Sequence, residues 1–523
     1  MRRRSFFASI GVLGCALSTR NAAALTADAA RGTTSSAGLA MASAAGATRH
    51  YLKRIASIDQ QGPQLHSIIE LNPDALQIAA ALDAERAAGT VRGPLHGVPV
   101  VIKDNIATGD RMATTAGSLA LDGVRATRDA HLVGCLRAAG AVILGKTNLS
   151  EWANLRSTRS ASGWSGRGGL SRNPYALDRS TSGSSSGSAA AVAANLTRMA
   201  IGTETDGSIV SPSSIMGVVG LKPTVGRISR DGIIPISRTQ DTPGPITRTV
   251  SDAALLLAAL AGPDPRDPAT LDAPPPGDYP GALDKDALRG ARIGVAREFF
   301  TGHDEIDQRI EFALAQLLVL GAELVDPIDL PKVSYETEEQ AVLLHEFKHD
   351  LPVWFETFAP HAPVRTLADV IAFNDAQRGS EMPYFGQELF IEAQALGGLD
   401  SDVYRHALAT CRKDSRDDGL DRVIRDQRLD AIVAPTGGTA WLTDLINGDS
   451  ASDGFSTPAA VAGYPHLTVP AGLVRGLPVG LSFVGPAWSE ARLLALGYAF
   501  EQATLWRSEP RFVKQSSIPP LNA

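Results

Sequence analysis

Short apolar runs alternate along the chain with longer segments whose apolar residues recur at helical spacing. The short runs predict strands at 98–102, 141–144, 292–296, 431–434 and 479–484. The longer segments predict helices at 130–139, 188–196, 251–261, 306–320 and 490–502, with helical spacing also over 51–88. Alternation on this scale is typical of an α/β layered domain with a mixed central sheet.

Residues 1–27 have the features of an export signal. Arginines at 2–4 precede an apolar run that ends at Leu17, and alanines at 22–24 offer a cleavage site. The run is too short to span a bilayer, and residues 3–7 (Arg-Arg-Ser-Phe-Phe) resemble a twin-arginine signal. A disordered basic N-terminus and lipoprotein processing at Cys15 are the alternatives. We expect a periplasmic or secreted protein with no stable membrane insertion after signal removal.

Composition divides the remaining chain. Residues 28–47 are rich in Ala, Ser, Gly and Thr, which predicts a linker. Residues 48–515 are expected to form a single domain. Within it, 330–430 is more polar and helical, and we interpret it as a cap that shapes a substrate cleft.

Charge and cysteine content exclude some classes of protein. The formal net charge is −7, which argues against a nucleic-acid binder that relies on a basic surface. Three cysteines are too few for a disulfide scaffold. Cys135 and Cys411 lie in helix-like segments and are interpreted as core residues.

Three windows carry candidate chemistry. Residues 179–188 are rich in Ser and Gly and run directly into an alanine helix, whose first turn supplies free backbone N–H groups. Residues 202–209 form a second Gly- and hydroxyl-rich turn that can act as an anion nest. Lys103 directly follows the strand predicted at 98–102, and a lysine buried there tends to lose its charge and can serve as a base.

Together these windows resemble the amidase signature family, and the resemblance runs from about residue 50 to residue 505. The matching segments are 97–105 around the lysine, 145–149, the serine loop 182–188, the nucleophile loop 202–212, 220–224 and 477–481. The resemblance implies a mixed central sheet with helices on both faces and a helical cap region.

The resemblance also implies a Ser–cis-Ser–Lys triad that works through an acyl-enzyme without a metal or an organic cofactor. By position, Ser208 is the nucleophile, Ser184 the bridging serine and Lys103 the base. Gly183 and Ser185 support the serine loop, with a cis peptide expected between Gly183 and Ser184. The expected oxyanion hole is formed by the backbone N–H groups of Thr205, Asp206, Gly207 and Ser208.

This sequence departs from the commonest family pattern at Ser182, Ser186, Glu204 and Asp206. The role of Asp206 is open between contact with the substrate amide and capping of its loop. The segments 150–154, 162–166 and 202–208 resemble the bacterial peptide amidase branch. That branch implies removal of the C-terminal amide of peptides to give a free acid and ammonia, by a protein expected to be monomeric. A general aliphatic or aryl amidase is the alternative.

A second motif suggests a different chemistry. Residues 345–349 (His-Glu-Phe-Lys-His) match H-E-x-x-H. On a helix, His345 and His349 would share a face and could bind zinc, with Glu346 as the base. No third ligand follows at a usual spacing, so we consider a zinc metallopeptidase the weaker hypothesis and predict no metal site.

Overall fold

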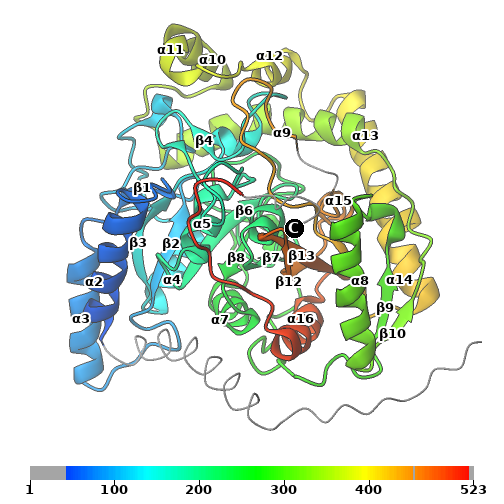
Figure 1. Cartoon of the computed structure of the whole chain (residues 1–523). Coiled ribbons are helices and arrows are strands. Elements are labelled where there is room, and N and C mark those ends of the chain that lie inside the picture. The colour runs from blue at the N-terminus through cyan, green and yellow to red at the C-terminus, as the bar shows by residue number, and fades with distance from the viewer. Residues whose placement is uncertain (1–42, 451–453, 517–523) are drawn as a thin grey trace, which may run out of the picture.

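The computed structural model describes residues 43–450 and 454–516, so the predicted export signal lies outside the described residues. Within them, eleven strands form one mixed sheet in the order β1-β3-β2-β6-β8-β7-β12-β13-β11-β9-β10 (Figure 1). Pairing is parallel for β3-β2-β6 and for β11-β9-β10, and antiparallel elsewhere. The strands are β1 (Ile68–Leu71), β2 (Pro99–Lys103), β3 (Val142–Thr147), β6 (Met199–Glu204), β7 (Val219–Lys222), β8 (Thr242–Thr247), β9 (Arg292–Val295), β10 (Glu323–Val325), β11 (Ala431–Pro435), β12 (His466–Val474) and β13 (Leu477–Val484). A separate hairpin pairs β4 (Trp164–Ser165) with β5 (Gly169–Leu170).

Helices cover both faces of this sheet. One face carries α2 (Ala44–Arg54), α3 (Ala75–Ala87), α5 (Ser186–Ala193) and α6 (Val210–Ile215). The other carries α4 (His131–Ala138), α7 (Val250–Leu260), α8 (Asp304–Val319) and α16 (Glu490–Thr504). Successive strand residues point to opposite faces, so Val101 packs in the first layer while Val100 and Ile102 pack in the second. Burial on both faces explains why β2 is apolar throughout until Lys103.

Residues 330–430 contain a run of helices, of which α10, α11 and α12 lie at the top of the molecule in Figure 1. Glu381 of α11 accepts hydrogen bonds from the Ser118 hydroxyl (3.0 Å) and the Leu119 N–H (2.6 Å), which fasten this region to the sheet domain. Its function as a cap stays a prediction. The helices are α9 (Glu336–Phe358), α10 (Leu367–Ala376), α11 (Arg378–Glu381), α12 (Glu388–Ala395), α13 (Asp402–Arg412) and α14 (Asp421–Gln427), while α15 (Thr457–Ala462) follows later in the chain.

Beyond small shifts at the ends of elements, two segments depart from the sequence-based expectation. The segment with helical spacing, 51–88, contains the strand β1 between its helices. The expected linker 28–47 overlaps the first described helix, because α2 begins at Ala44. Ser43 caps that helix through the Gly46 N–H (3.0 Å), and Asp83 accepts the N–H groups of Ala44 and Ala45.

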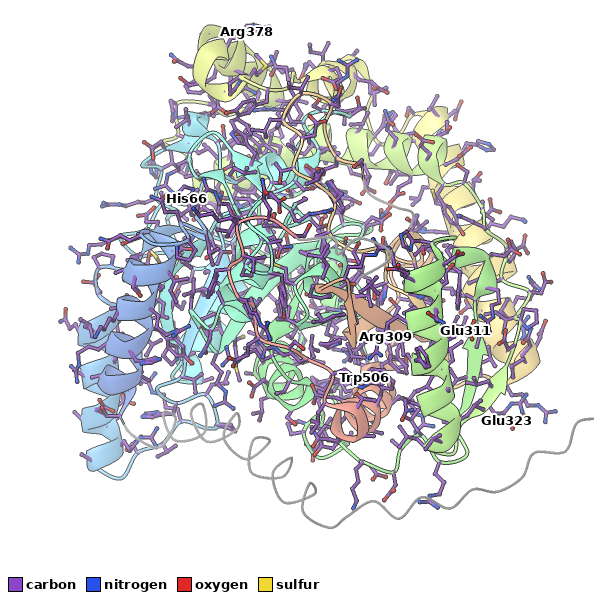
Figure 2. The ribbon with its side chains drawn as sticks, in the orientation of Figure 1. His66, Arg309, Glu311, Glu323, Arg378 and Trp506 are labelled. Carbon is purple, nitrogen blue, oxygen red and sulfur yellow. The ribbon has the colours of Figure 1, made fainter. Side chains whose placement is uncertain are left out.

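Helix α8 is tied to β12 and to the segment that follows α16. Arg309 of α8 donates to the Ala471 carbonyl (2.6 Å), and its guanidinium lies 3.9 Å from the ring centre of Trp506 (Figure 2). No helix of the described residues is both long and apolar enough to cross a bilayer.

The first turn of α5 requires a glycine at position 187. A Cβ built on Gly187 would lie 2.2 Å from the Ser67 carbonyl oxygen and 2.6 Å from that of Asn148, both of them backbone atoms. We expect Gly187→Ala to lower the free energy of unfolding by about 1–3 kcal/mol, because backbone must move to admit the methyl group. Gly134→Ala is the matched control: no atom lies within 4 Å of its Cβ, and alanine in a helix is favoured by about 1 kcal/mol. Urea unfolding would measure both, and a Gly187→Ala protein as stable as the Gly134→Ala protein would contradict the steric account.

Candidate active site

Lys103 ends β2 as a fully buried amine. Its Nζ lies 2.7 Å from the Ser184 hydroxyl oxygen, 2.9 Å from the Thr203 hydroxyl and 3.1 Å from the Thr203 carbonyl. Burial lowers the pKa of Lys103 to about 7, although the nearby carboxylates of Asp241 and Glu204 partly oppose the shift. A large share of these amines is therefore neutral near pH 7.

The three contacts of Lys103 suit the neutral amine. A neutral amine has two N–H bonds and one lone pair. The two oxygens of Thr203 can accept the two N–H bonds, which leaves the lone pair free to accept the Ser184 hydroxyl proton. Asn105 also donates to the Thr203 hydroxyl (3.0 Å) and so holds it in place. The sequence-predicted base and bridging serine are thus in direct contact.

Ser184 lies just before α5, and the peptide between Gly183 and Ser184 is cis, as expected. The Ser150 N–H donates to the Ser184 carbonyl (3.1 Å). The next residue joins the serine loop to the nucleophile loop, because the Ser185 N–H donates to the Ser208 carbonyl (3.1 Å) and the Ser185 hydroxyl donates to the Thr203 carbonyl (3.0 Å). Ser185 therefore connects the serine loop to the nucleophile loop.

Ser208 follows β6 and is 8% exposed. The structure brings its loop against the serine loop, but no hydrogen bond joins the Ser184 and Ser208 hydroxyls in the described part of the chain. Catalytic hydrogen bonds are often long in an empty site and tighten when substrate binds.

The loop that ends at Ser208 presents unused donors. Within residues 43–450 and 454–516, the N–H groups of residues 205–208 donate no hydrogen bond, whereas those of Ile209 and Val210 both donate to Glu204 (2.7 and 3.0 Å). Gly207 has φ = +74°, a conformation that few side chains tolerate. The turn therefore offers a cluster of free N–H groups beside a serine hydroxyl, which suits the binding of a negatively charged oxygen.

The Asp206 carboxylate contacts the first residue of α15. Its Oδ2 accepts the Thr457 hydroxyl (2.6 Å), which supports the loop-capping role. Its Oδ1 is buried and has no hydrogen-bond partner in the described residues. Burial raises the pKa of Asp206, while the hydroxyls of Ser456 and Thr457 and the charge of Lys222 lower it.

Thr205 is held by two residues of the segment before β8. The Thr205 hydroxyl donates to Asp241 (2.6 Å), and the Gln240 side-chain amide donates to the Thr205 carbonyl (3.4 Å) and to Glu339 (2.7 Å). Asp241 also accepts the N–H groups of Ile236 and Ser237, and burial raises its pKa to about 6. These contacts fix the orientation of the first donor of the nucleophile loop.

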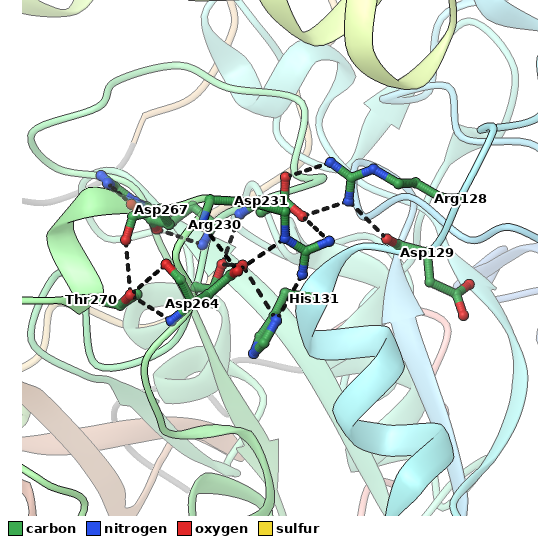
Figure 3. A network of polar contacts seen from close by, with 10 residues as sticks. Arg128, Asp129, His131, Arg230, Asp231, Asp264, Asp267 and Thr270 are labelled. Carbon is green, nitrogen blue, oxygen red and sulfur yellow. Dashed lines mark hydrogen bonds and ion pairs between the residues drawn. The ribbon is translucent and has the colours of Figure 1, made fainter.

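Ion pairs hold residues 230 and 231, which lead into the segment that carries Gln240 and Asp241, as Figure 3 shows. Arg128 binds both carboxylate oxygens of Asp231 (2.6 and 2.8 Å), and Arg230 binds both oxygens of Asp267 (2.9 and 2.6 Å). Bidentate pairs of this kind restrict orientation as well as distance. These ion pairs therefore restrict the position of the chain just before Gln240 and Asp241.

The H-E-x-x-H segment has structural contacts. Glu346 is fully buried and accepts the Tyr404 hydroxyl (2.7 Å) and the Thr239 hydroxyl (3.1 Å). His345 faces the Ala341 carbonyl (2.6 Å), and His349 pairs with Asp350 (2.7 Å). No three His, Cys, Asp or Glu side chains in the described ranges are arranged to hold a metal ion. Glu346 instead links α9 and α13 to the segment that supports Thr205.

Two further buried lysines differ from Lys103 in their partners. Lys146 donates to the carbonyls of Ile106 (2.7 Å) and Ala113 (3.1 Å) and to the Thr114 hydroxyl (3.0 Å). Lys222 lies near Glu204, and burial lowers its pKa to about 8. In the part of the chain that the structure describes, neither lysine forms a hydrogen bond with Ser184 or Ser208.

Sequence reasoning did not single out Thr203, Gln240, Asp241 or Glu339 as parts of this site. Thr203 lies inside the Gly- and hydroxyl-rich window 202–209, but it was not named there as a site residue. A signal for Gln240 and Asp241 exists in the sequence, since these two polar residues directly precede the strand segment Thr-Pro-Gly-Pro-Ile-Thr. No local pattern marks Glu339, which approaches the loop only through the fold.

Comparisons with known proteins identify the family of this chain. The Amidase family profile matches residues 46–494. An Arabidopsis thaliana protein described as a probable amidase is 42% identical over 475 residues, which cover 88% of this chain and 87% of that protein. A glutamyl-tRNA(Gln) amidotransferase subunit from Halorhodospira halophila is 39% identical, with 88% of this chain and 94% of that protein covered. The native peptide amidase of Stenotrophomonas maltophilia superimposes with a TM-score of 0.87 at 51% identity, over 93% of this chain and 97% of that chain. The chain therefore belongs to the amidase family and is an amide-hydrolysing enzyme of the amidase-signature α/β fold.

Proposed function

We propose that this enzyme removes the C-terminal carboxamide of peptides and releases a free acid and ammonia. The observation that carries the chemistry is the 2.7 Å contact between the buried amine of Lys103 and the Ser184 hydroxyl, beside a loop of free N–H groups that ends at Ser208. The similarity to the peptide amidase of Stenotrophomonas maltophilia supports the substrate.

In this proposal Ser208 Oγ attacks the carboxamide carbon. Its proton moves to Ser184 as the Ser184 proton moves to neutral Lys103. The N–H groups of residues 205–208 stabilise the negative oxygen that forms, a contribution of about 10²–10³ in rate for a single such donor in other hydrolases. The C–N bond then breaks, and the proton returns through Ser184 to the leaving nitrogen as ammonia departs. Water adds to the acyl-enzyme, releases the acid and restores the Ser208 hydroxyl.

The place of action is part of the same proposal. An export signal at residues 1–27 would bring the enzyme to peptides outside the cytoplasm. That location does not suit the amidotransferase chemistry named for the relative from Halorhodospira halophila, which we expect to work in the cytoplasm with partner subunits.

A panel of three substrates tests the reaction. We expect the mature protein to release ammonia from a peptide amide, to leave the internal bonds of the same peptide intact, and to act more slowly on a simple aryl amide. Ammonia release and mass spectrometry of the products measure all three. Substantial internal cleavage would overturn the proposal, and a faster reaction on the aryl amide would favour the general amidase instead.

A further inference from the structure

A pocket of about 500 Å³ lies beside the nucleophile loop and has no role in the mechanism above. Its wall includes Phe299, Lys332, Tyr335, Glu336, Glu339 and Thr457. Two contacts place it next to Ser208. Thr457 donates to Asp206, and a Cβ on Gly207 would lie 3.0 Å from the hydroxyl oxygen of Ser456. The pocket wall and the nucleophile loop are therefore in contact through Thr457.

The inner wall of the pocket is a carboxyl group with an incomplete set of partners. Glu339 is 9% exposed, and Gln240 is the one residue of the described chain that donates a hydrogen bond to it, at Oε1. Its second oxygen has no such donor. Unlike the Asp206 Oδ1, this second oxygen is not closed off from solvent, so it is open to a group that enters the pocket. No lysine, arginine or histidine within 43–450 and 454–516 forms an ion pair with Glu339 or Asp206.

Asp206 is the second acid of this cluster. Its Oδ1 is buried without a partner among the residues described. Burial raises the pKa of both acids, and burial together with the charge of Asp206 raises the pKa of Glu339 to about 8. A cation beside Glu339 would favour the ionised form of its carboxyl.

The rest of the wall suits a cation with an apolar stem. Glu336 lies one helical turn before Glu339 and is exposed at the pocket, while the rings of Phe299 and Tyr335 are buried. Aromatic faces attract ammonium and guanidinium groups, and Lys332 Nζ already lies 6.0 Å from the ring centre of Phe299. Acidic side chains outnumber this one lysine around the pocket.

We propose that this pocket accepts the ammonium or guanidinium group of a lysine or arginine in the last two residues of a peptide amide. The proposal rests on the proposed function and adds a substrate preference to it. Glu339 is the residue that would pair with the cation, and the charge-assisted hydrogen bonds would replace the partners that its carboxyl lacks.

The test uses peptide amides that differ in one group. Acetyl-Ala-Ala-Arg-amide is compared with its citrulline analogue, in which an uncharged urea replaces the guanidinium. In a second pair of peptide amides, arginine or citrulline stands one position before the C-terminal residue. We expect kcat/KM to be at least about tenfold higher for arginine than for citrulline in one of the two pairs. Glu339→Gln should reduce that ratio to within about twofold of one. The ratio is independent of the fraction of active enzyme, so partial misfolding of the variant does not obscure it.

Glu338→Gln is the matched control. It makes the same substitution in the same turn of α9, but Glu338 does not line the pocket, so the wild-type ratio should remain. Equal kcat/KM for arginine and citrulline in the wild-type enzyme would overturn this inference alone, since the proposed function would still hold. A preference that survives Glu339→Gln would also overturn it. A protein that releases ammonia from none of the four peptides would contradict the proposed function itself.

Discussion

Ser208→Ala should abolish ammonia release from peptide amides, with a loss of about 10⁴–10⁶ in kcat. In a hydrolase whose catalytic groups act as a unit, removing the nucleophile costs nearly as much as removing the whole set, and the remaining rate comes from the oxyanion donors and binding. The change deletes one oxygen from an 8% exposed side chain and leaves the N–H groups of the loop in place. A fluorophosphonate probe followed by intact-mass measurement should label the wild-type protein once and the variant not at all.

Ser213→Ala is the control for this experiment. Ser213 lies one turn further along in α6, and its buried hydroxyl has no hydrogen-bond partner in the described residues. Its removal should leave both activity and labelling close to wild type. A Ser208→Ala protein that still reacts with the probe would move the nucleophile to another serine of the two loops and contradict the assignment.

Local sequence was sufficient for the parts of the site that lie on one continuous segment. The β-branched run before Lys103 predicts a buried strand, and β2 has that strand with Lys103 as its last residue. The serine loop and the nucleophile loop were placed by their motifs, and the cis peptide before Ser184 was expected and is present. In each case the signal and the structure belong to the same few residues.

Partners that meet only through the fold were not predictable in this way. Asp241 reaches Thr205 across 36 residues of chain, and Gln240 reaches Glu339 across 99. The same limit applies to β1, whose four residues pair with β3 more than 70 positions later and are only partly buried. Strand formation depends on such neighbours more than on intrinsic preference, so periodicity alone did not separate β1 from the helices around it.

The supports of the nucleophile loop therefore come from three distant regions. Thr457 holds Asp206, the segment 236–241 holds Thr205, and Glu346 of α9 holds that segment. Since α9 also carries Glu339, a single helix contributes both to the loop that performs chemistry and to the pocket proposed to select the substrate. Changes along α9 can thus affect the rate and the substrate preference together. For this reason the test of Glu339 uses the ratio of kcat/KM for two substrates.

The second large effect is expected at Lys103. Lys103→Ala should lower kcat by about 10²–10⁴, the usual contribution of a general base. Lys103→Arg should be no better, because a guanidinium stays charged in proteins and cannot accept the Ser184 proton. If Lys103→Arg restores activity, a positive charge rather than a base is needed at this position, and the proposed mechanism fails.

The pH dependence of kcat/KM tests the role of Lys103 separately. With a pKa of about 7, Lys103 is protonated below that pH and neutral above it. Only the neutral amine can accept a proton, so kcat/KM should rise about tenfold per pH unit up to about pH 7 and then level off. Asp241 favours the charged lysine, so Asp241→Asn should lower the pKa of Lys103 and move this inflection to lower pH, whatever it does to the maximal rate. Asp241→Asn changes the charge around the amine, and Lys103→Ala removes the amine. An inflection that stays at the same pH in Asp241→Asn, or that persists in the residual activity of Lys103→Ala, would therefore show that another group titrates.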